Sequence, residues 1–132
     1  MSRGLPFLSG LALPLIAAPM LRISGIELVS AACRAGIVGS FPTPNARTTE
    51  ELDAWLQRLD RERDEALAAG RRYGPCCPNL IMRRDPAQLR AAVERFAAHH
   101  VPVVITSVGS PAALMPQLKD AGIAVLADVA SV

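Results

Sequence analysis

Five short, continuously apolar runs separated by stretches with helical periodicity are the feature that most constrains the fold of this chain. Strands that are buried on both faces of a parallel sheet have this continuous character, whereas half-exposed strands alternate between apolar and polar residues. The spacing therefore predicts five buried strands, at residues 13–18, 36–41, 76–82, 101–108 and 123–129.

Four helices are predicted between these strands, at about 25–35, 48–70, 85–100 and 110–122. The second has the clearest start, because Thr48 and Glu51 form a capping box. The third begins at Asp85 and fades at the adjacent histidines, and Pro116 is expected to kink the fourth or delay its start. The proposed cap of the first helix is Ser24. The apolar residues expected to face inward are Ile26, Val29, Cys33, Leu52, Trp55, Leu56, Leu59, Leu67, Leu89, Val93 and Phe96.

Alternating strands and helices predict an α/β fold with a parallel sheet and right-handed crossovers. Two architectures fit: a five-stranded, flavodoxin-like doubly wound sheet, or the first five strands of a (β/α)8 TIM barrel, which needs about 250 residues. The last predicted strand reaches the end of the 132-residue sequence without a covering helix. We therefore expect a single domain, residues 1–132, that is the N-terminal portion of a barrel.

Composition narrows the class of partner. Hydrophobic residues make up 51% of the chain and charged residues 20%, which indicates a packed globular core. The net charge of +2 is spread along the sequence, so we expect no nucleic-acid partner.

No apolar stretch reaches the length of a membrane span, and Pro6 and Pro14 interrupt an N-terminal run that resembles a secretory signal. Cys33, Cys76 and Cys77 have no disulfide or metal-site spacing, which favours reduced thiols and a cytoplasmic location.

Ligands in such folds meet the carboxyl ends of the strands, where this sequence carries little acid–base chemistry. The strand ends hold backbone-rich turns and amides rather than a histidine or a carboxylate pair, and His99 and His100 are expected at a helix C-terminus. No metal site and no phosphate-binding glycine motif is present. The turns suit a planar heterocycle such as a flavin, whose edge accepts main-chain hydrogen bonds, but they equally fit ordinary strand-to-helix turns.

The sequence resembles the nitronate monooxygenase (2-nitropropane dioxygenase) family, whose members are FMN-dependent TIM barrels. The matching segments are PLIAAPM at 14–20, AGIVGS at 35–40, PNL at 78–80, VPVVITSVGSP at 101–111 and AGIAVLADVASV at 121–132. The second segment is one glycine short of the family's usual pair.

The resemblance implies FMN as the cofactor and assigns five residues to its site. Pro19, Met20 and Leu21 match a turn whose backbone contacts the flavin, and Asn79 matches an asparagine that hydrogen-bonds to it. Asp128 stands where some members have a lysine, and a carboxylate there would disfavour an anionic reduced flavin. The family's phosphate loops and catalytic histidine would lie beyond Val132, so no catalytic residue is expected within this chain.

The resemblance implies oxidation of alkyl nitronates by oxygen to a carbonyl compound and nitrite, with a small-molecule substrate. The chain alone is expected to be inactive, and its unpaired outer strands are compatible with a homo-oligomer. Two alternatives stay open: a flavin-dependent enoyl-ACP reductase of the same fold, and a non-catalytic flavodoxin-like binding domain.

Overall fold

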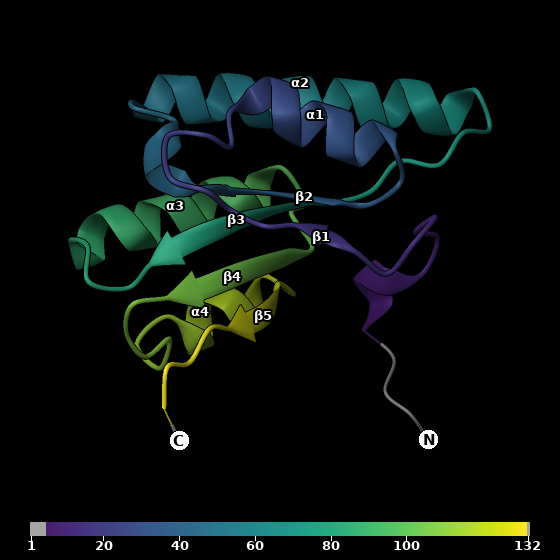
Figure 1. The fold of residues 1–132 in the computed structure, drawn as a ribbon. Coiled ribbons are helices and arrows are strands. Elements are labelled where there is room, and N and C mark those ends of the chain that lie inside the picture. Colours follow the sequence, from purple (N-terminus) through teal and green to yellow (C-terminus); the bar gives the residue numbers. More distant parts are fainter. Residues whose placement is uncertain (1–4, 132) are drawn as a thin grey trace.

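In the computed structural model, which describes residues 5–131, the chain forms one five-stranded parallel sheet in the order β1-β2-β3-β4-β5 (Figure 1). The strands are β1 (Ile16–Ala17), β2 (Val38–Pro42), β3 (Cys76–Ile81), β4 (Val103–Ser107) and β5 (Ala124–Ala127). The helices are α1 (Ile26–Arg34), α2 (Thr49–Ala68), α3 (Pro86–Ala98) and α4 (Met115–Asp120), with 3-10 turns η1 (Pro6–Leu8) and η2 (Thr43–Asn45). All five predicted strands and all four predicted helices are therefore present.

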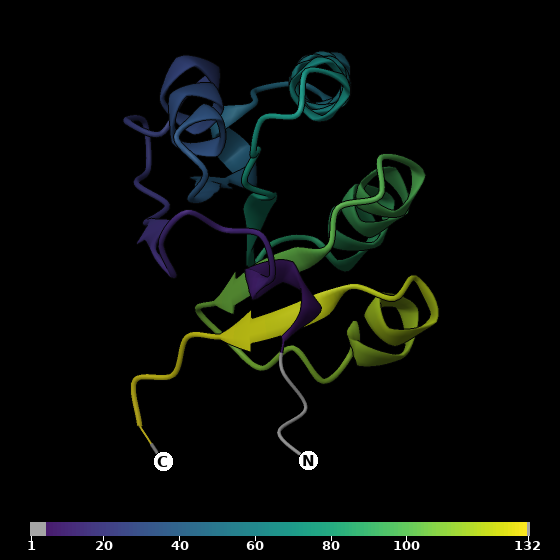
Figure 2. The same ribbon diagram turned by 90° about the vertical axis from the view of Figure 1, so that its right-hand side faces the viewer.

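The order of the strands decides between the two predicted architectures. Each strand pairs with the next one along the chain, and all four pairings are parallel. A doubly wound sheet reverses its direction of growth at a switch point, and no such reversal occurs here. Figure 2 shows the strands curling together, with the helices on the outer side. The fold is thus an α/β arrangement of five barrel strands, as predicted, and the flavodoxin-like alternative is wrong.

Helix boundaries follow from local chemistry at most of the predicted positions. The Thr48 hydroxyl accepts the Glu51 N–H at 3.1 Å, as the predicted capping box requires, but the Glu51 carboxylate accepts the N–H of Arg47, one residue before the N-cap, at 2.7 Å in place of the N–H of Thr48. Asp85 caps α3 by accepting two backbone N–H groups. Pro116 lies in the first turn of α4, so it delays the start of the helix instead of kinking it.

Two local predictions are wrong. Ser24 does not cap α1: the N-cap residue is Gly25, and the Ser24 hydroxyl accepts the N–H of Met20 at 2.8 Å. Leu67 is 58% exposed, and the preceding residue of α2, Ala66, is buried in its place. Both errors come from the long-range arrangement of the chain, which helical spacing does not encode.

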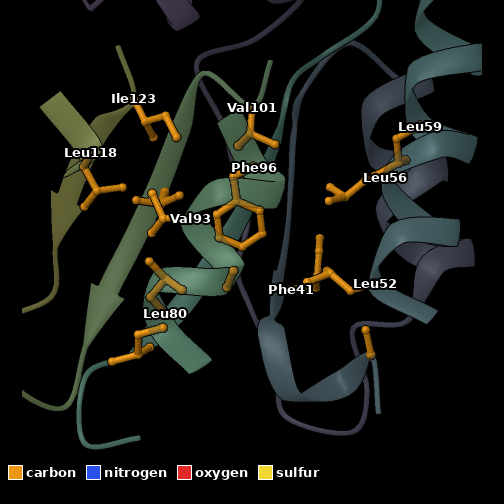
Figure 3. Close-up of a cluster of buried hydrophobic side chains, with 14 of the residues drawn as sticks. Phe41, Leu52, Leu56, Leu59, Leu80, Val93, Phe96, Val101, Leu118 and Ile123 are labelled. Carbon is orange, nitrogen blue, oxygen red and sulfur yellow. The ribbon is translucent and has the colours of Figure 1, made fainter. Parts of the chain in front are cut away.

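The sheet separates two apolar layers. On the outer side, Phe41 and Leu80 pack against α2 and α3, where Leu56, Val93 and Phe96 complete the core (Figure 3). On the inner side the core is small and consists of Val38, Cys77 and Val103, covered by Phe7 of the N-terminal segment. The packing on the outer side is close: a Cβ on Gly39 would stand 2.7 Å from the backbone oxygen of Val29, so only glycine lets α1 lie this close to β2.

None of the helices in residues 5–131 has the length and apolarity needed to cross a membrane.

Candidate functional site

Asn79 occupies the inner face of β3 near the carboxyl end of the strand. Its neighbour on one side in the sheet is Ile105 of β4, and its side chain is 6% exposed. The Nδ2 group donates to the backbone oxygen of Ile105 at 3.2 Å and to Oγ of Ser107 at 3.0 Å. Both amide hydrogens are therefore used within the protein, and Oδ1 is left as the group that can accept a hydrogen bond from a ligand.

Two hydroxyls fix the neighbouring strand ends around Asn79. Thr43, directly after β2, donates to the backbone oxygen of Asn79 at 2.7 Å. Ser40 donates a short hydrogen bond to the backbone oxygen of Cys77. These bonds tie β2 to β3 at the level of Asn79, so the amide is held in a defined position before any ligand binds.

The turn after β4 contains the most unusual backbone of the site. Val108 has a φ of 56°, in the left-handed region, and its side chain is 50% exposed. A β-branched residue rarely adopts this conformation, and such strain is concentrated at functional sites. The residue lies one position after Ser107, the partner of Asn79, which places the strained turn at the edge of the same inner face.

The turn after β1, which contains Pro19, Met20 and Leu21, is held by a side chain that sequence reasoning missed. Asn45 of η2 donates from Nδ2 to the backbone oxygens of Met20 and Ser24, both at 3.0 Å. Its Oδ1 accepts the N–H of Arg22 at 2.9 Å, and Arg22 itself has a φ of 65°. The only local signal was the Thr-Pro-Asn turn, which does not indicate a partner more than 20 residues away.

Asp128 lies directly after β5, and its N–H donates to the backbone oxygen of Thr106 at 2.8 Å. Continuing the β4–β5 register by one residue places Asp128 opposite Ser107. Neighbouring strands lie about 4.8 Å apart, so two strand spacings, about 10 Å, separate Asp128 from the strand of Asn79. The predicted site residues therefore lie after β1, in β3 and after β5, all at the edge of the sheet that the carboxyl ends of the strands form.

This edge offers hydrogen bonding rather than acid–base chemistry. Within residues 5–131, the backbone N–H groups of Leu21, Val108 and Gly109 have no acceptor in the protein. With Oδ1 of Asn79 they supply several donors and one acceptor for a planar polar ligand. Asp128 is the one ionisable group among the predicted site residues. No cluster of metal-ligating side chains occurs in the described part of the chain.

Shifted pKa values occur away from this edge. Burial alone would raise the pKa of Glu62, but hydrogen bonds from Ser30, Arg58 and Tyr73 hold it below the usual value. Burial raises the pKa of Cys33 to about 12. This carboxylate network connects α1 to α2 and serves the fold, since none of its members reaches the inner face.

The remaining cysteines and the histidines also lie where the sequence placed them, in a strand and at a helix end, and not at the carboxyl ends of the strands. Cys76 and Cys77 are free thiols within β3, and burial raises the pKa of Cys77 to about 12. His99 is the C-cap of α3, and its Nδ1 lies 2.6 Å from Oδ2 of Asp60 on α2. The prediction of a helix C-terminus is confirmed, and the carboxylate partner is an addition that spacing did not show.

Comparison with known proteins supports the architecture. No protein-family model and no curated protein matches the sequence. Among solved structures, FabK from Thermotoga maritima, a TIM-barrel protein, is similar over 97% of this chain, with a TM-score of 0.73 and 23% identity. A point mutant of that FabK gives a TM-score of 0.74 and 24% identity over 96% of this chain. The present chain spans 38% of the length of either structure. Similarity at this level establishes the fold, a parallel α/β sheet equivalent to part of a TIM barrel.

Proposed function

We propose that this chain forms the isoalloxazine-contacting part of an FMN-dependent oxidoreductase. The observation that carries the proposal is the preorganised Asn79, whose Nδ2 is satisfied by Ile105 and Ser107 while its Oδ1 is left to accept. A flavin ring presents an N–H that can donate to such an oxygen and carbonyls that can accept from backbone N–H groups. The similarity to FabK, an FMN-dependent enoyl-ACP reductase of the 2-nitropropane dioxygenase type, supports the same cofactor.

In this proposal each predicted residue has a specific task. The turn at Pro19, Met20 and Leu21 lies against the flavin edge and contributes the free N–H of Leu21. Asn79 accepts from the ring, and Asp128 adds negative charge at the far side of the edge. When bound, FMN supplies the electron transfer, while these residues orient it and bias its protonation.

The substrate is proposed at two levels. The coarser level is an FMN-dependent redox reaction on a small molecule in the cytoplasm. The finer level is a choice between nitronate oxidation, which the sequence motifs favour, and enoyl-ACP reduction, which the similarity to FabK favours at least as strongly. The carboxylate of Asp128 disfavours an anionic reduced flavin, so the electronic tuning differs from that of members with a lysine at this position.

Activity is proposed for a complete barrel. Among residues 5–131, both β1 and β5 have a strand neighbour on one side only, and the inner face carries few buried side chains. We infer that three further βα units pair with these edges in the active protein and supply the phosphate-binding loops and the catalytic acid or base.

The test is FMN binding by the full-length protein and by its Asn79→Ala variant. Loss of one hydrogen bond of about 0.5–1.5 kcal/mol predicts 2- to 12-fold weaker FMN retention, measured by flavin fluorescence. The variant also loses the Nδ2 bonds to Ile105 and Ser107, so the apoprotein should stay folded with a lowered melting temperature. Ser107→Ala is the matched comparison: it removes one bond that positions the Asn79 amide but keeps Oδ1 as the acceptor, so it should weaken FMN retention less than Asn79→Ala does. An Asn79→Ala variant that binds FMN as tightly as the parent would refute the assignment.

A second assay separates the two reactions. Nitrite release from an alkyl nitronate in air supports the monooxygenase, and oxidation of reduced nicotinamide by an enoyl thioester supports the reductase. Failure of both with FMN bound would exclude both substrate assignments while leaving the cofactor assignment intact.

A further inference from the structure

A groove of about 320 Å3 lies on the outer side of the sheet between the first turns of α2 and α3. Leu80 of β3 forms part of its floor, while the preceding residue, Asn79, faces the opposite side of the same strand. The body of the sheet therefore separates the groove from the proposed flavin edge. Its volume is at the lower end of the ~300–1,000 Å3 typical of small-molecule sites.

The charge of the groove is one-sided. Arg47, Arg84 and Arg95 contribute to its lining, from the segment before α2, the β3–α3 loop and α3 respectively, and no Asp or Glu lines it. Arg95 is paired with Asp53. The guanidinium groups of Arg47 and Arg84 have no carboxylate partner among residues 5–131.

The other nearby carboxylates are already engaged. Glu51 accepts the backbone N–H of Arg47 just before α2, and Asp85 caps α3 through the N–H groups of Ala87 and Gln88. Neither carboxylate forms an ion pair with Arg47 or Arg84, so the two guanidinium groups are left to solvent or to a ligand. Other arginines, such as Arg61 and Arg71, also have no ion pair among residues 5–131, so the feature particular to this place is that two such arginines line one groove that no Asp or Glu lines.

The remaining lining residues add to the same selectivity. The hydroxyls of Thr48 and Thr49 and the amide of Gln88 supply neutral hydrogen-bonding groups. Both flanking helices, of 20 and 13 residues, begin at the groove, but the carboxylates of Glu50, Glu51 and Asp85 at these helix starts offset the positive ends of the dipoles, which leaves the arginines as the source of positive charge. The floor is apolar and consists of Ala46, Leu52, Leu80, Leu89 and Ala92.

From these observations we propose that the α2–α3 groove binds a small organic phosphate, with the phosphate at Arg47 and Arg84 and an apolar body on the leucine floor. A guanidinium group can donate two parallel hydrogen bonds to the oxygens of a phosphate. Two unpaired arginines also match the charge of a phosphate dianion better than the single charge of a carboxylate ligand. The site is independent of the flavin, so it would serve a second ligand of the protein.

The test is titration of the ¹⁵N-labelled protein with phenyl phosphate, followed by amide chemical shifts. We expect saturable shifts at residues 47–52 and 84–89. Inorganic phosphate and benzyl alcohol, which each carry one half of the ligand chemistry, are expected to bind more weakly, and benzoate tests the carboxylate alternative.

Two double variants of equal charge decide the outcome. The Arg47→Ala, Arg84→Ala double variant is expected to bind phenyl phosphate at least tenfold more weakly, because each substitution removes a charge-assisted hydrogen bond to the phosphate. Arg61→Ala with Arg71→Ala removes the same charge at exposed positions away from the groove and is expected to change the dissociation constant less than twofold. Circular dichroism and melting temperature show whether each variant folds.

Three results would overturn the proposal: shifts that map outside the groove, equal weakening by both double variants, or benzoate binding as tightly as phenyl phosphate. FMN binding, measured by flavin fluorescence on the same samples, tests the proposed function separately from the groove. The two tests are independent because neither Arg47 nor Arg84 lies on the inner face of the sheet.

Discussion

Replacing Asn45 by alanine should loosen the turn after β1 without disturbing the core. The side chain makes three hydrogen bonds to that turn, and it is half-buried, so water can replace part of what is lost. A neutral hydrogen bond contributes a net ~0.5–1.5 kcal/mol, and partial solvent access places the total at about 1–2 kcal/mol. For a chain of this size we expect the melting temperature to fall by roughly 3–10 °C.

The local effect is more diagnostic than the global one. Arg22 adopts a left-handed backbone that costs about 1–2 kcal/mol for a residue other than glycine, and Asn45 accepts its N–H. Amide hydrogen exchange at Arg22 should therefore accelerate strongly in Asn45→Ala, while exchange in β3 is unchanged.

Two variants serve as controls for this prediction. Asn45→Asp keeps the acceptor for Arg22 but loses both donors, so it should protect the Arg22 amide while still lowering the melting temperature. Gln57→Ala removes an exposed amide on α2 and should change the free energy of unfolding by less than about 0.5 kcal/mol. Unchanged exchange at Arg22 in Asn45→Ala would refute the reasoning.

Three further outcomes are expected. Val108→Gly should raise the free energy of unfolding by about 0.5–1 kcal/mol in urea titrations, because relief of the left-handed strain exceeds the added entropy of the unfolded chain; a destabilised variant would contradict this. Because the pKa of Glu62 is lowered in the folded state, its contribution to stability is fully present above the ordinary glutamate pKa and is lost as the pH falls through the folded pKa. Glu62→Gln should therefore flatten the pH dependence of the free energy of unfolding below about pH 4.3. An unchanged slope in this variant would argue against the role of Glu62. Cys33 and Cys77, with pKa values raised to about 12, should resist iodoacetamide at pH 8 until the protein is unfolded, which mass spectrometry of the alkylated chain measures.

Local chemistry made most of the fold predictable. The Thr48 cap that accepts the Glu51 N–H, the Asp85 cap and the position of Pro116 depend on residues within four positions of one another, and the structure contains all three features. The continuous apolar runs gave the strands, because burial on both faces leaves no polar alternation to obscure them.

The unpredicted features depend on residues that are distant in sequence. Ser24 and Asn45 are polar residues near turns, and their partners are set by how the loops after β1 and β2 meet. The groove at Arg47 and Arg84 was also missed, since two residues 37 positions apart in the sequence give no common signal. At the candidate site, the sequence placed Asn79 and Asp128 on one edge, while the strain at Val108 is visible only in the backbone.

The strictly sequential pairing of the strands also affects how the molecule can be made. Every strand finds its partner one helix earlier in the chain, so each new βα unit has a completed edge to join as soon as it leaves the ribosome. A sheet with a reversed order would instead have to wait for a later strand to fill a central position. Contacts between successive units keep the loop-closure entropy small at each step, which favours vectorial growth of the sheet during synthesis.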